Sequence, residues 1–353
     1  MKKHVFVPFA LILLLLLSAC GQTTSSQNAP LPEEKSSAAV ETSSSDLGES
    51  QLEDSHYPVT ITNYNYAGEE ITLTFDKAPE RVLAVYQGCV ETMIVLGLED
   101  HVIASYGLDN EVKEEWKDGF SRMKYNESSF APDKETVVML NPDLIFSWGS
   151  IFDEKMLGDV GYWIGNGTNT YINTNTRVGG PRILENEYAD ILNIGKIFNV
   201  EDKAEAIVNQ MKADVEKAKA ASEAMPEAPS VGIIGFYDAG IRNFGLELAG
   251  DIAEHLKVDV MKSPERYVGK EDLIAADPDV MFIEYMPRPE GGGDEVKNEE
   301  LAKFLDDPAL ASMSAIKNGR VYPIMLGDIY APAVRTGDGI RTIAGGVFPG
   351  IFD

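Results

Sequence analysis

Aromatic, amide and arginine side chains follow several segments that we predict to be buried strands. In parallel α/β folds ligands bind beyond the carboxyl ends of the strands, so these positions are candidates for ligand contact. The candidates are Tyr86, Gln87, Ser105, Tyr106, Trp148, Ser150, Phe236, Tyr237, Arg242, Tyr285, Arg288, Tyr330, Arg335 and Arg341. Aromatic rings stack on flat organic groups, and arginine clamps carboxylates, phosphates or an anionic iron chelate. The pattern favours a binding cleft, although each residue alone could be a surface arginine or a half-buried aromatic.

The histidines argue against a metal centre built from imidazoles. His4 lies in an N-terminal apolar segment, His56 precedes the folded region, and His101 and His255 lie at or near the ends of predicted elements. A zinc or manganese centre needs several histidines and carboxylates together, so a histidine-rich centre is disfavoured. Ferric iron held by tyrosine and carboxylate oxygens stays open, and a metal already wrapped in an organic chelator fits best. We expect no metal ligand set and no cofactor.

Enzyme motifs give no support for catalysis. The chain has no Gly-x-Ser-x-Gly elbow, no Gly-Lys-Ser/Thr phosphate loop and no His-Glu-x-x-His sequence. Acidic pairs are common at this composition, and we expect Asp109–Glu115 to be a solvated acidic stretch. The sequence therefore predicts a binding protein without enzymatic activity.

Composition excludes further classes. The 353 residues include 57 Asp and Glu against 30 Lys and Arg, for a formal charge of −27. Such a surface repels nucleic-acid phosphates, so we expect no nucleic-acid partner. Two cysteines build neither a disulfide framework nor a cysteine-type zinc site. The length and an apolar content of 44% suffice for about two domains.

The N-terminus has the pattern of an export signal. Lys2 and Lys3 precede an apolar run at 5–17, which is too short for a comfortable membrane span, and small residues lead to Cys20. Leu17-Ser18-Ala19-Cys20 resembles the bacterial lipobox, which predicts a signal peptide at 1–19 and a lipid on Cys20. The alternative is a plain signal peptide with an incidental cysteine. Residues 20–57 are polar and predict a flexible tether, and Cys89 is interpreted as a small core residue.

The rest of the chain alternates strands with helices. We predict a hairpin at 59–62 and 71–75, and strands at 81–85, 102–105, 144–147, 231–236, 280–283 and 320–323. Helices are predicted at 91–98, 184–192, 199–224, 246–256 and 299–305, with shorter ones near 309 and 340. A variant capping box is assigned to Asn199–Asp202. The alternation predicts an α/β fold with largely parallel sheets, and the helix that ends near 224 is long enough to join two domains.

An internal repeat divides the fold. Residues 134–146 and 270–282 share Lys-Glu at the start, Pro-Asp before a buried strand, and a constant offset of 136 positions. One copy precedes the long helix and one follows it. The repeat predicts two similarly built lobes at 58–183 and 227–353, joined by a helical region at 184–226.

The order of these segments resembles a known family. Arg81–Ala84, Glu91–Gly97, Asn141–Ile145, Ile194–Phe198 and Pro308–Pro323 are similar to the substrate-binding lipoproteins of bacterial ABC importers for ferric siderophores, haem and vitamin B12. The resemblance covers about residues 78 to 345. It implies two Rossmann-like lobes bridged by one rigid helix, with ligand in the cleft between them.

The resemblance also implies partners. One glutamate on each lobe, here Glu135 and Glu271, would pair with arginine pockets of the permease, although both could be ordinary first-turn residues favoured by the helix dipole. We therefore expect a monomer, lipid-anchored to the bacterial cell membrane outside the cytoplasm, that delivers a ferric siderophore to a permease and its ATPase. Haem, cobalamin or bare ferric iron are alternative ligands. A surface adhesin or signalling module without transport is an alternative function.

Overall fold

The computed structural model describes residues 56–287 and 292–353. The predicted signal peptide at 1–19, the lipidated Cys20, nearly all of the tether at 20–57, and Arg288 lie outside the described residues. Among those that are described, none of the helices is both long and apolar enough to cross a membrane.

The first sheet has four parallel strands in the order β4-β3-β5-β6. The strands are β3 Val82–Val85, β4 Val102–Tyr106, β5 Leu144–Ser147 and β6 Asn169–Ile172. The helices of this part are α1 Gln87–Val95, α2 Lys117–Arg122, α3 Lys134–Leu140 and α4 Val160–Gly165. An antiparallel hairpin, β1 Val59–Tyr64 and β2 Glu70–Phe75, precedes them. Both faces of β3 and β5 are buried, which explains their continuous apolar sequences.

The second sheet has six strands, in the order β10-β8-β7-β11-β12 with β9 paired to β7. Its strands are β7 Ser230–Tyr237, β8 Gly240–Asn243, β9 Asp259–Val260, β10 Tyr267–Val268, β11 Val280–Tyr285 and β12 Val321–Met325. Its helices are α7 Leu248–His255, α8 Lys270–Ala276, α9 Gly293–Leu305, α10 Ser314–Lys317 and α11 Thr336–Val347. Side chains alternate across β11: Phe282 belongs to the core with α7 and α11, whereas Met281 and Ile283 belong to the core with α8 and α9.

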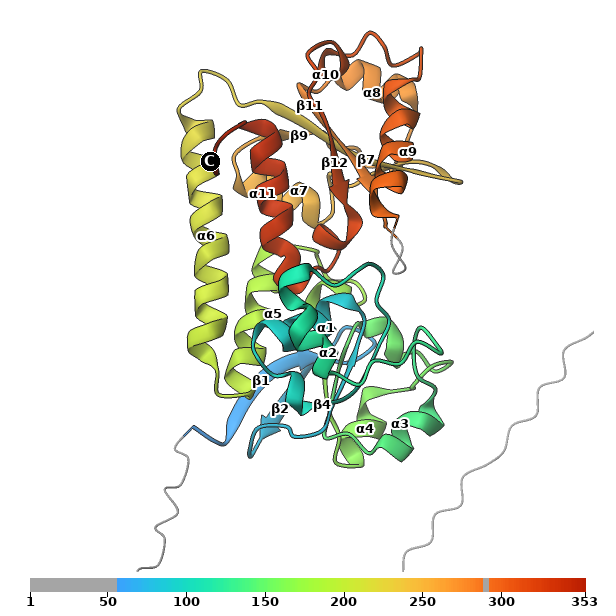
Figure 1. Cartoon of the computed structure of the whole chain (residues 1–353), viewed down its shortest axis with the longest axis vertical. Helices are drawn as coiled ribbons and strands as arrows, with labels where there is room; N and C mark the ends of the chain where they lie inside the picture. Colours follow the sequence, from blue (N-terminus) through green and yellow to red (C-terminus); the bar gives the residue numbers. More distant parts are fainter. Residues whose placement is uncertain (1–55, 288–291) are drawn as a thin grey trace, which may run out of the picture. The chain divides into compact units, whose positions relative to one another are not determined.

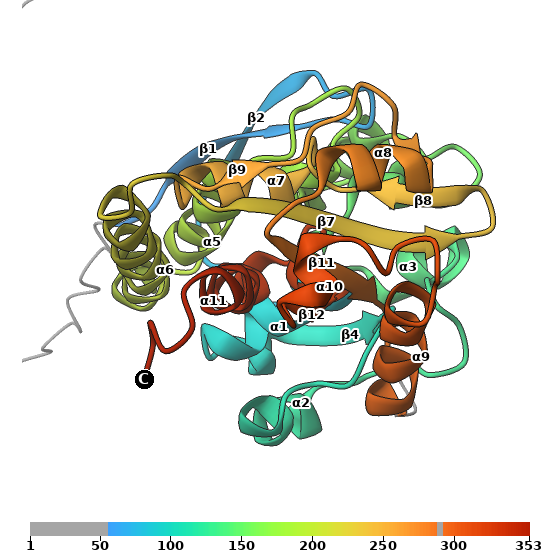
Figure 2. The ribbon, with the colours of Figure 1, turned by 90° about the horizontal axis from the view of Figure 1, so that it is seen from above.

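Two helices connect the sheets. Helix α5 Leu184–Ile197 leads into α6 Glu201–Glu223, whose 23 residues extend about 35 Å at 1.5 Å per residue. Figures 1 and 2 show α6 beside α5 and α11. One apolar cluster continues through both sheets and these three helices. The prediction of an α/β fold with two Rossmann-like lobes joined by one long helix is confirmed.

Some local predictions were wrong. Asn199 does not cap α6: it has a left-handed backbone (φ 55°) just after α5, and the residue before α6 is Val200, whose side chain makes no cap. Helix α1 begins at Gln87 and not near 91, and α9 begins at Gly293 and not at 299. No helix forms at 309, where the chain turns before α10. The fully buried Cys89 lies in the core, and its burial raises the pKa of the thiol.

The internal repeat has a structural basis. Helices α3 and α8 end at Asn141 and Asp277, which both adopt left-handed backbone conformations, and Asn and Asp tolerate these better than most residues. Asp143 then accepts hydrogen bonds from the backbone N–H groups of Glu80 and Arg81, just before β3. Its counterpart Asp279 accepts from the backbone N–H of Ser230 at the start of β7. The Pro-Asp pair thus fixes one strand against its neighbour in each lobe.

Candidate ligand-binding site

A small cavity lies where the two lobes meet. From the first lobe it is lined by the start of α1 (Gln87 and Gly88), by Asp109 and Asn110, and by Trp148. From the second it is lined by Met286, Leu326, Gly327 and the segment 330–332. Its volume of about 30 Å³ holds little more than water, so a chelate does not fit in this conformation.

A larger cavity of about 450 Å³ shares Asn110 with the small one. Glu111, Tyr285, Met325 and Asp294 also line it, so both lobes contribute. This volume is within the range of small-molecule sites. The space between the lobes that can accept an organic ligand is therefore beside Tyr285.

Aromatic rings border the small cavity, which Trp148 and Tyr330 line. Tyr86 has a left-handed backbone (φ 75°) just before α1, and its ring packs 4.8 Å from that of Trp148. Trp148 in turn meets Tyr330 edge-on at 5.9 Å. The Trp148 indole N–H is buried and has no hydrogen-bond partner among the described residues. A ligand acceptor would satisfy it.

Two arginine guanidinium groups also lie near the Tyr330 ring. Arg182 lies 4.1 Å above the Tyr330 ring and donates to its hydroxyl at 2.7 Å. Arg182 and Arg242 share the carboxylate of Glu247, at 3.2 and 2.6 Å. Burial lowers the pKa of Arg242, but the hydrogen bond and charge of Glu247 outweigh it and raise the pKa overall. Two fixed positive charges against one carboxylate leave an excess positive charge.

Acidic and phenolic groups behind these arginines are poorly solvated. Burial raises the pKa of Glu284 to about 7, although hydrogen bonding to Tyr237 opposes the rise. Burial also raises the pKa of Tyr237 to about 12. The partial neutrality of Glu284 near pH 7 leaves the positive charge of the arginine pair less compensated.

Comparison with known proteins gives the family. The family model described as "Periplasmic binding protein" matches residues 82–325, which is more than half of the chain. The chain belongs to this family. No curated protein sequence matches it.

Solved structures of periplasmic binding proteins share the fold. One from Veillonella parvula has a TM-score of 0.77 and 28% identity, over 84% of this chain and 93% of that one. An ABC-type Fe³⁺-hydroxamate transport protein from Saccharomonospora viridis has a TM-score of 0.63 and 22% identity, over 83% and 100%. The siderophore-binding protein BauB, solved with ferric iron and two acinetobactin molecules, has a TM-score of 0.61 and 19% identity, over 82% and 98%. The last two likenesses show the fold alone.

The structure brings together many of the candidates predicted from the sequence. Gln87, Trp148 and Tyr330 line the small cavity and Tyr285 lines the large one. Tyr86 packs behind Trp148, and the rings of Tyr237 and Tyr330 lie within 6 Å of the Arg242 guanidinium. These positions are consistent with ligand contact, which stays a prediction for each of them.

Other candidates lie elsewhere. Arg335 is 3% exposed and both its Nε and one terminal nitrogen donate to Glu91 at 2.6 Å, so its charge is committed to that pair. Arg341 binds Asp214 of α6 and lines a separate cavity between α6 and α11. Tyr106 is buried, and its hydroxyl accepts from Asn126. None of the three lines either cavity between the lobes.

Sequence reasoning missed the acidic loop and Arg182. We expected Asp109–Glu115 to be solvated, but Asn110 and Val112 are buried, and burial raises the pKa of Asp109 to about 6. Gln87 explains this, because its side-chain oxygen accepts from the backbone N–H groups of Asp109 and Asn110 and pulls the loop inward. Arg182 follows no strand, and no sequence signal distinguishes it from a surface arginine.

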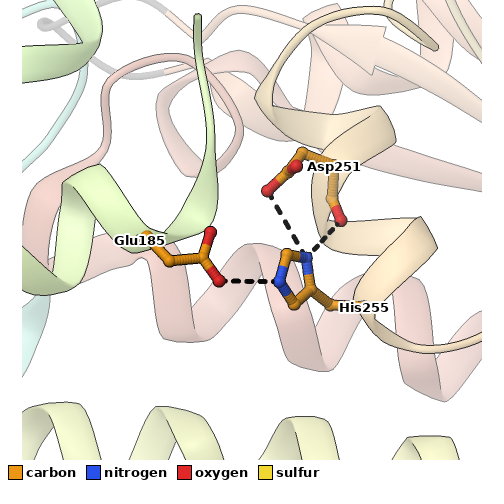
Figure 3. A group of neighbouring side chains, drawn as sticks. All are labelled: Glu185, Asp251 and His255. Atoms are coloured by element: carbon orange, nitrogen blue, oxygen red, sulfur yellow. Dashed lines mark hydrogen bonds and ion pairs between the residues drawn. The ribbon is translucent and has the colours of Figure 1, made fainter.

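A histidine between two carboxylates lies at the joint of α5 and α7 (Figure 3). Within the described part of the chain, one group of three histidine, cysteine or carboxylate side chains has ligand atoms close enough to share a metal ion. It consists of Glu185, Asp251 and His255. However, His255 Nε2 faces the Glu185 carboxylate at 2.8 Å and Nδ1 faces the Asp251 backbone oxygen at 2.8 Å. Both nitrogens face acceptors, so the arrangement suits a doubly protonated imidazolium.

The ion pair of His255 should make stability depend on pH. Burial lowers the pKa of His255, but its bonds to Asp251 and Glu185 and their charges raise it overall. A raised folded-state pKa means that the stabilisation is complete below the unfolded value of about 6.5 and is lost as pH rises through the folded value. Glu254 adds negative charge nearby, although Lys262 pairs with it.

In a double-mutant cycle of His255→Gln and Glu185→Gln, urea unfolding should give a coupling energy at pH 5.5 that falls at pH 8.5. An equal coupling at both pH values would contradict the imidazolium.

Proposed function

We propose that this protein is the lipid-anchored receptor of an ABC importer and captures an anionic ferric chelate, such as a ferric siderophore, between its lobes. The observation that carries the proposal is the pair Arg182 and Arg242 beside the aromatic wall of Tyr330 and Trp148. In a chain with a formal charge of −27, an excess of positive charge at this place favours an anionic ligand. The siderophore bound to BauB and the hydroxamate transport of the Saccharomonospora protein support an iron chelate.

Binding tests the ligand directly. Protein without residues 1–19 is titrated with ferric catecholate, hydroxamate and carboxylate chelates, haem and cobalamin, and both tryptophan quenching and calorimetry are recorded. We expect the anionic ferric chelates to bind best. If haem or cobalamin binds best, that compound and not a ferric chelate is the ligand. If no member of the panel binds, the proposed receptor function is wrong.

Delivery is proposed to use the paired glutamates. Glu135 and Glu271 are exposed, occupy the same place in helices α3 and α8, and carry the offset of the internal repeat. Equivalent acidic groups on two lobes suit a partner with two-fold symmetry. Cys20 would carry the lipid, and residues 20–57 would tether the receptor to the outer face of the cell membrane.

Charge reversal separates docking from capture. In the double variant Glu135→Lys/Glu271→Lys, we expect chelate affinity within about twofold of the wild type and loss of uptake in cells, because these exposed charges act on association with the permease. The matched control is Glu205→Lys/Glu223→Lys, which reverses two exposed charges of α6. Uptake as fast as that of the control would contradict docking at Glu135 and Glu271.

A further inference from the structure

The first lobe has a further cavity, of about 720 Å³, which is distinct from the three cavities described above. Leu108, Val112, Phe120 and Tyr125 supply its apolar walls, and Phe130, whose side chain is 55% exposed, lies at its edge. The volume lies within the range that holds a drug-sized organic group.

The cavity shares lining residues with the space between the lobes. Asn110 lines this cavity and both cavities between the lobes, and Glu111 lines both the 450 Å³ cavity and this one. Asn110 is 2% exposed, and its side-chain oxygen has no hydrogen-bond partner among the described residues. A buried acceptor without a donor is costly, so a ligand N–H or hydroxyl at this junction would be stabilising.

The charges at the cavity select the kind of group it takes. Glu111 and Glu127 line it, and the lysine that lines it, Lys117, already pairs with Glu114 at 2.6 Å. This balance disfavours an anion. The matching group is therefore aromatic or aliphatic, uncharged, and attached through a hydrogen-bond donor such as an amide N–H.

We propose that this cavity is a second subsite, which binds an uncharged apolar arm of the ligand while the metal-binding head lies between the lobes. The part of the inference that concerns the metal-binding head rests on the proposed function, whereas the cavity itself is formed by residues of the first lobe. The receptor would then distinguish chelates by an arm that takes no part in holding the metal.

The first test uses N-phenyl-1-naphthylamine, a neutral fluorescent probe with one N–H donor. We expect saturable binding to the wild-type protein and an affinity at least about tenfold weaker in Ser129→Trp, which places a large side chain at the cavity lining. Ser121→Trp is the matched control, because Ser121 is exposed on α2 and is not part of this lining. No saturable binding, or equal binding by both variants, would overturn the subsite.

The second test joins the arm to a head. Two ferric tris-catecholate chelates are compared, one with an acetyl amide and one with a naphthoyl amide on the scaffold. The naphthoyl arm should raise wild-type affinity about tenfold or more and give no gain in Ser129→Trp, whereas the acetyl chelate should bind both proteins equally. Equal affinity of the two chelates for the wild type would overturn the link between cavity and head. If neither chelate binds but the naphthylamine does, the proposed function fails and the apolar site is supported.

Discussion

Replacing Glu91 with glutamine is expected to lower the free energy of unfolding by about 3–5 kcal/mol, because it breaks a buried ion pair and leaves one charge behind. The Glu91 side chain is fully buried and that of Arg335 is 4% exposed. Two parallel hydrogen bonds of 2.6 Å join them, and Arg335 also donates to the Glu111 backbone oxygen. In Glu91→Gln the guanidinium stays buried with neutral acceptors and with Asp328 3.9 Å away. Urea unfolding followed by circular dichroism measures the loss.

The matched control is Glu80→Gln. Glu80 pairs with Lys77 at 2.7 Å, but both side chains are about two-thirds exposed, and exposed pairs contribute about 0–1 kcal/mol. The double variant Glu91→Leu/Arg335→Met should be more stable than Glu91→Gln, because no buried charge remains. If Glu91→Gln lowered the free energy of unfolding no more than Glu80→Gln does, the result would contradict a buried ion pair between Glu91 and Arg335.

This pair also matters for the site, because it joins the lobes close to segments that line the small cavity. Glu91 belongs to α1 of the first lobe, and Arg335 follows the cavity-lining segment 330–332 of the second. The backbone N–H of Ala333, in the same loop, donates to the buried Glu187 of α5 at 2.6 Å. Ala331 and Ala333 both have left-handed backbones, which is uncommon for alanine and is maintained here by these contacts. Stability and site geometry are thus coupled in one loop.

The fold could be predicted from the sequence because its signals are local. The buried strands are short apolar runs, and the repeat at Asn141 and Asp277 encodes a left-handed helix end followed by a strand. Short or polar strands such as β6 and β8 lack that signal and were missed. The Asn199 assignment failed because a polar residue between two helices can end the first or begin the second, and packing decides which.

The site was harder to predict because its contacts are distant in sequence. Arg335 was predicted to contact ligand from its residue type, but its partner Glu91 is 244 positions away. Arg182 reaches Tyr330 across 148 positions and Glu247 across 65. Asn110 was assigned to a solvated stretch because polarity predicts exposure, whereas Gln87 draws its loop inward. Local sequence identifies which side chains can bind, but not which of them already have partners.

The second large effect is expected from Arg182, which is the more exposed arginine of the pair that shares Glu247. Its side chain is 29% exposed, against 8% for Arg242, and its bond to Glu247 is the longer of the two. Hydrogen bonds to charged groups contribute about 1.5–3 kcal/mol, so Arg182→Gln should weaken an anionic ferric chelate about 10- to 100-fold. The loss should appear mainly as faster dissociation, and a neutral chelate should lose much less. Stopped-flow dissociation measures the rate, and titrations with an anionic and a neutral chelate measure the difference in affinity.

Two further variants make this result specific. Arg182→Lys keeps the charge but loses the planar group that stacks on Tyr330, so its affinity should lie between wild type and Arg182→Gln. Arg177→Gln is the matched control, because Arg177 stacks on Tyr64 at 4.2 Å and not on Tyr330, which lines the small cavity. Equal losses for the anionic and the neutral chelate would mean that Arg182 acts by holding Tyr330 in place. In that case Arg182 would not distinguish an anionic from a neutral chelate, and selectivity for the anion would be assigned to Arg242.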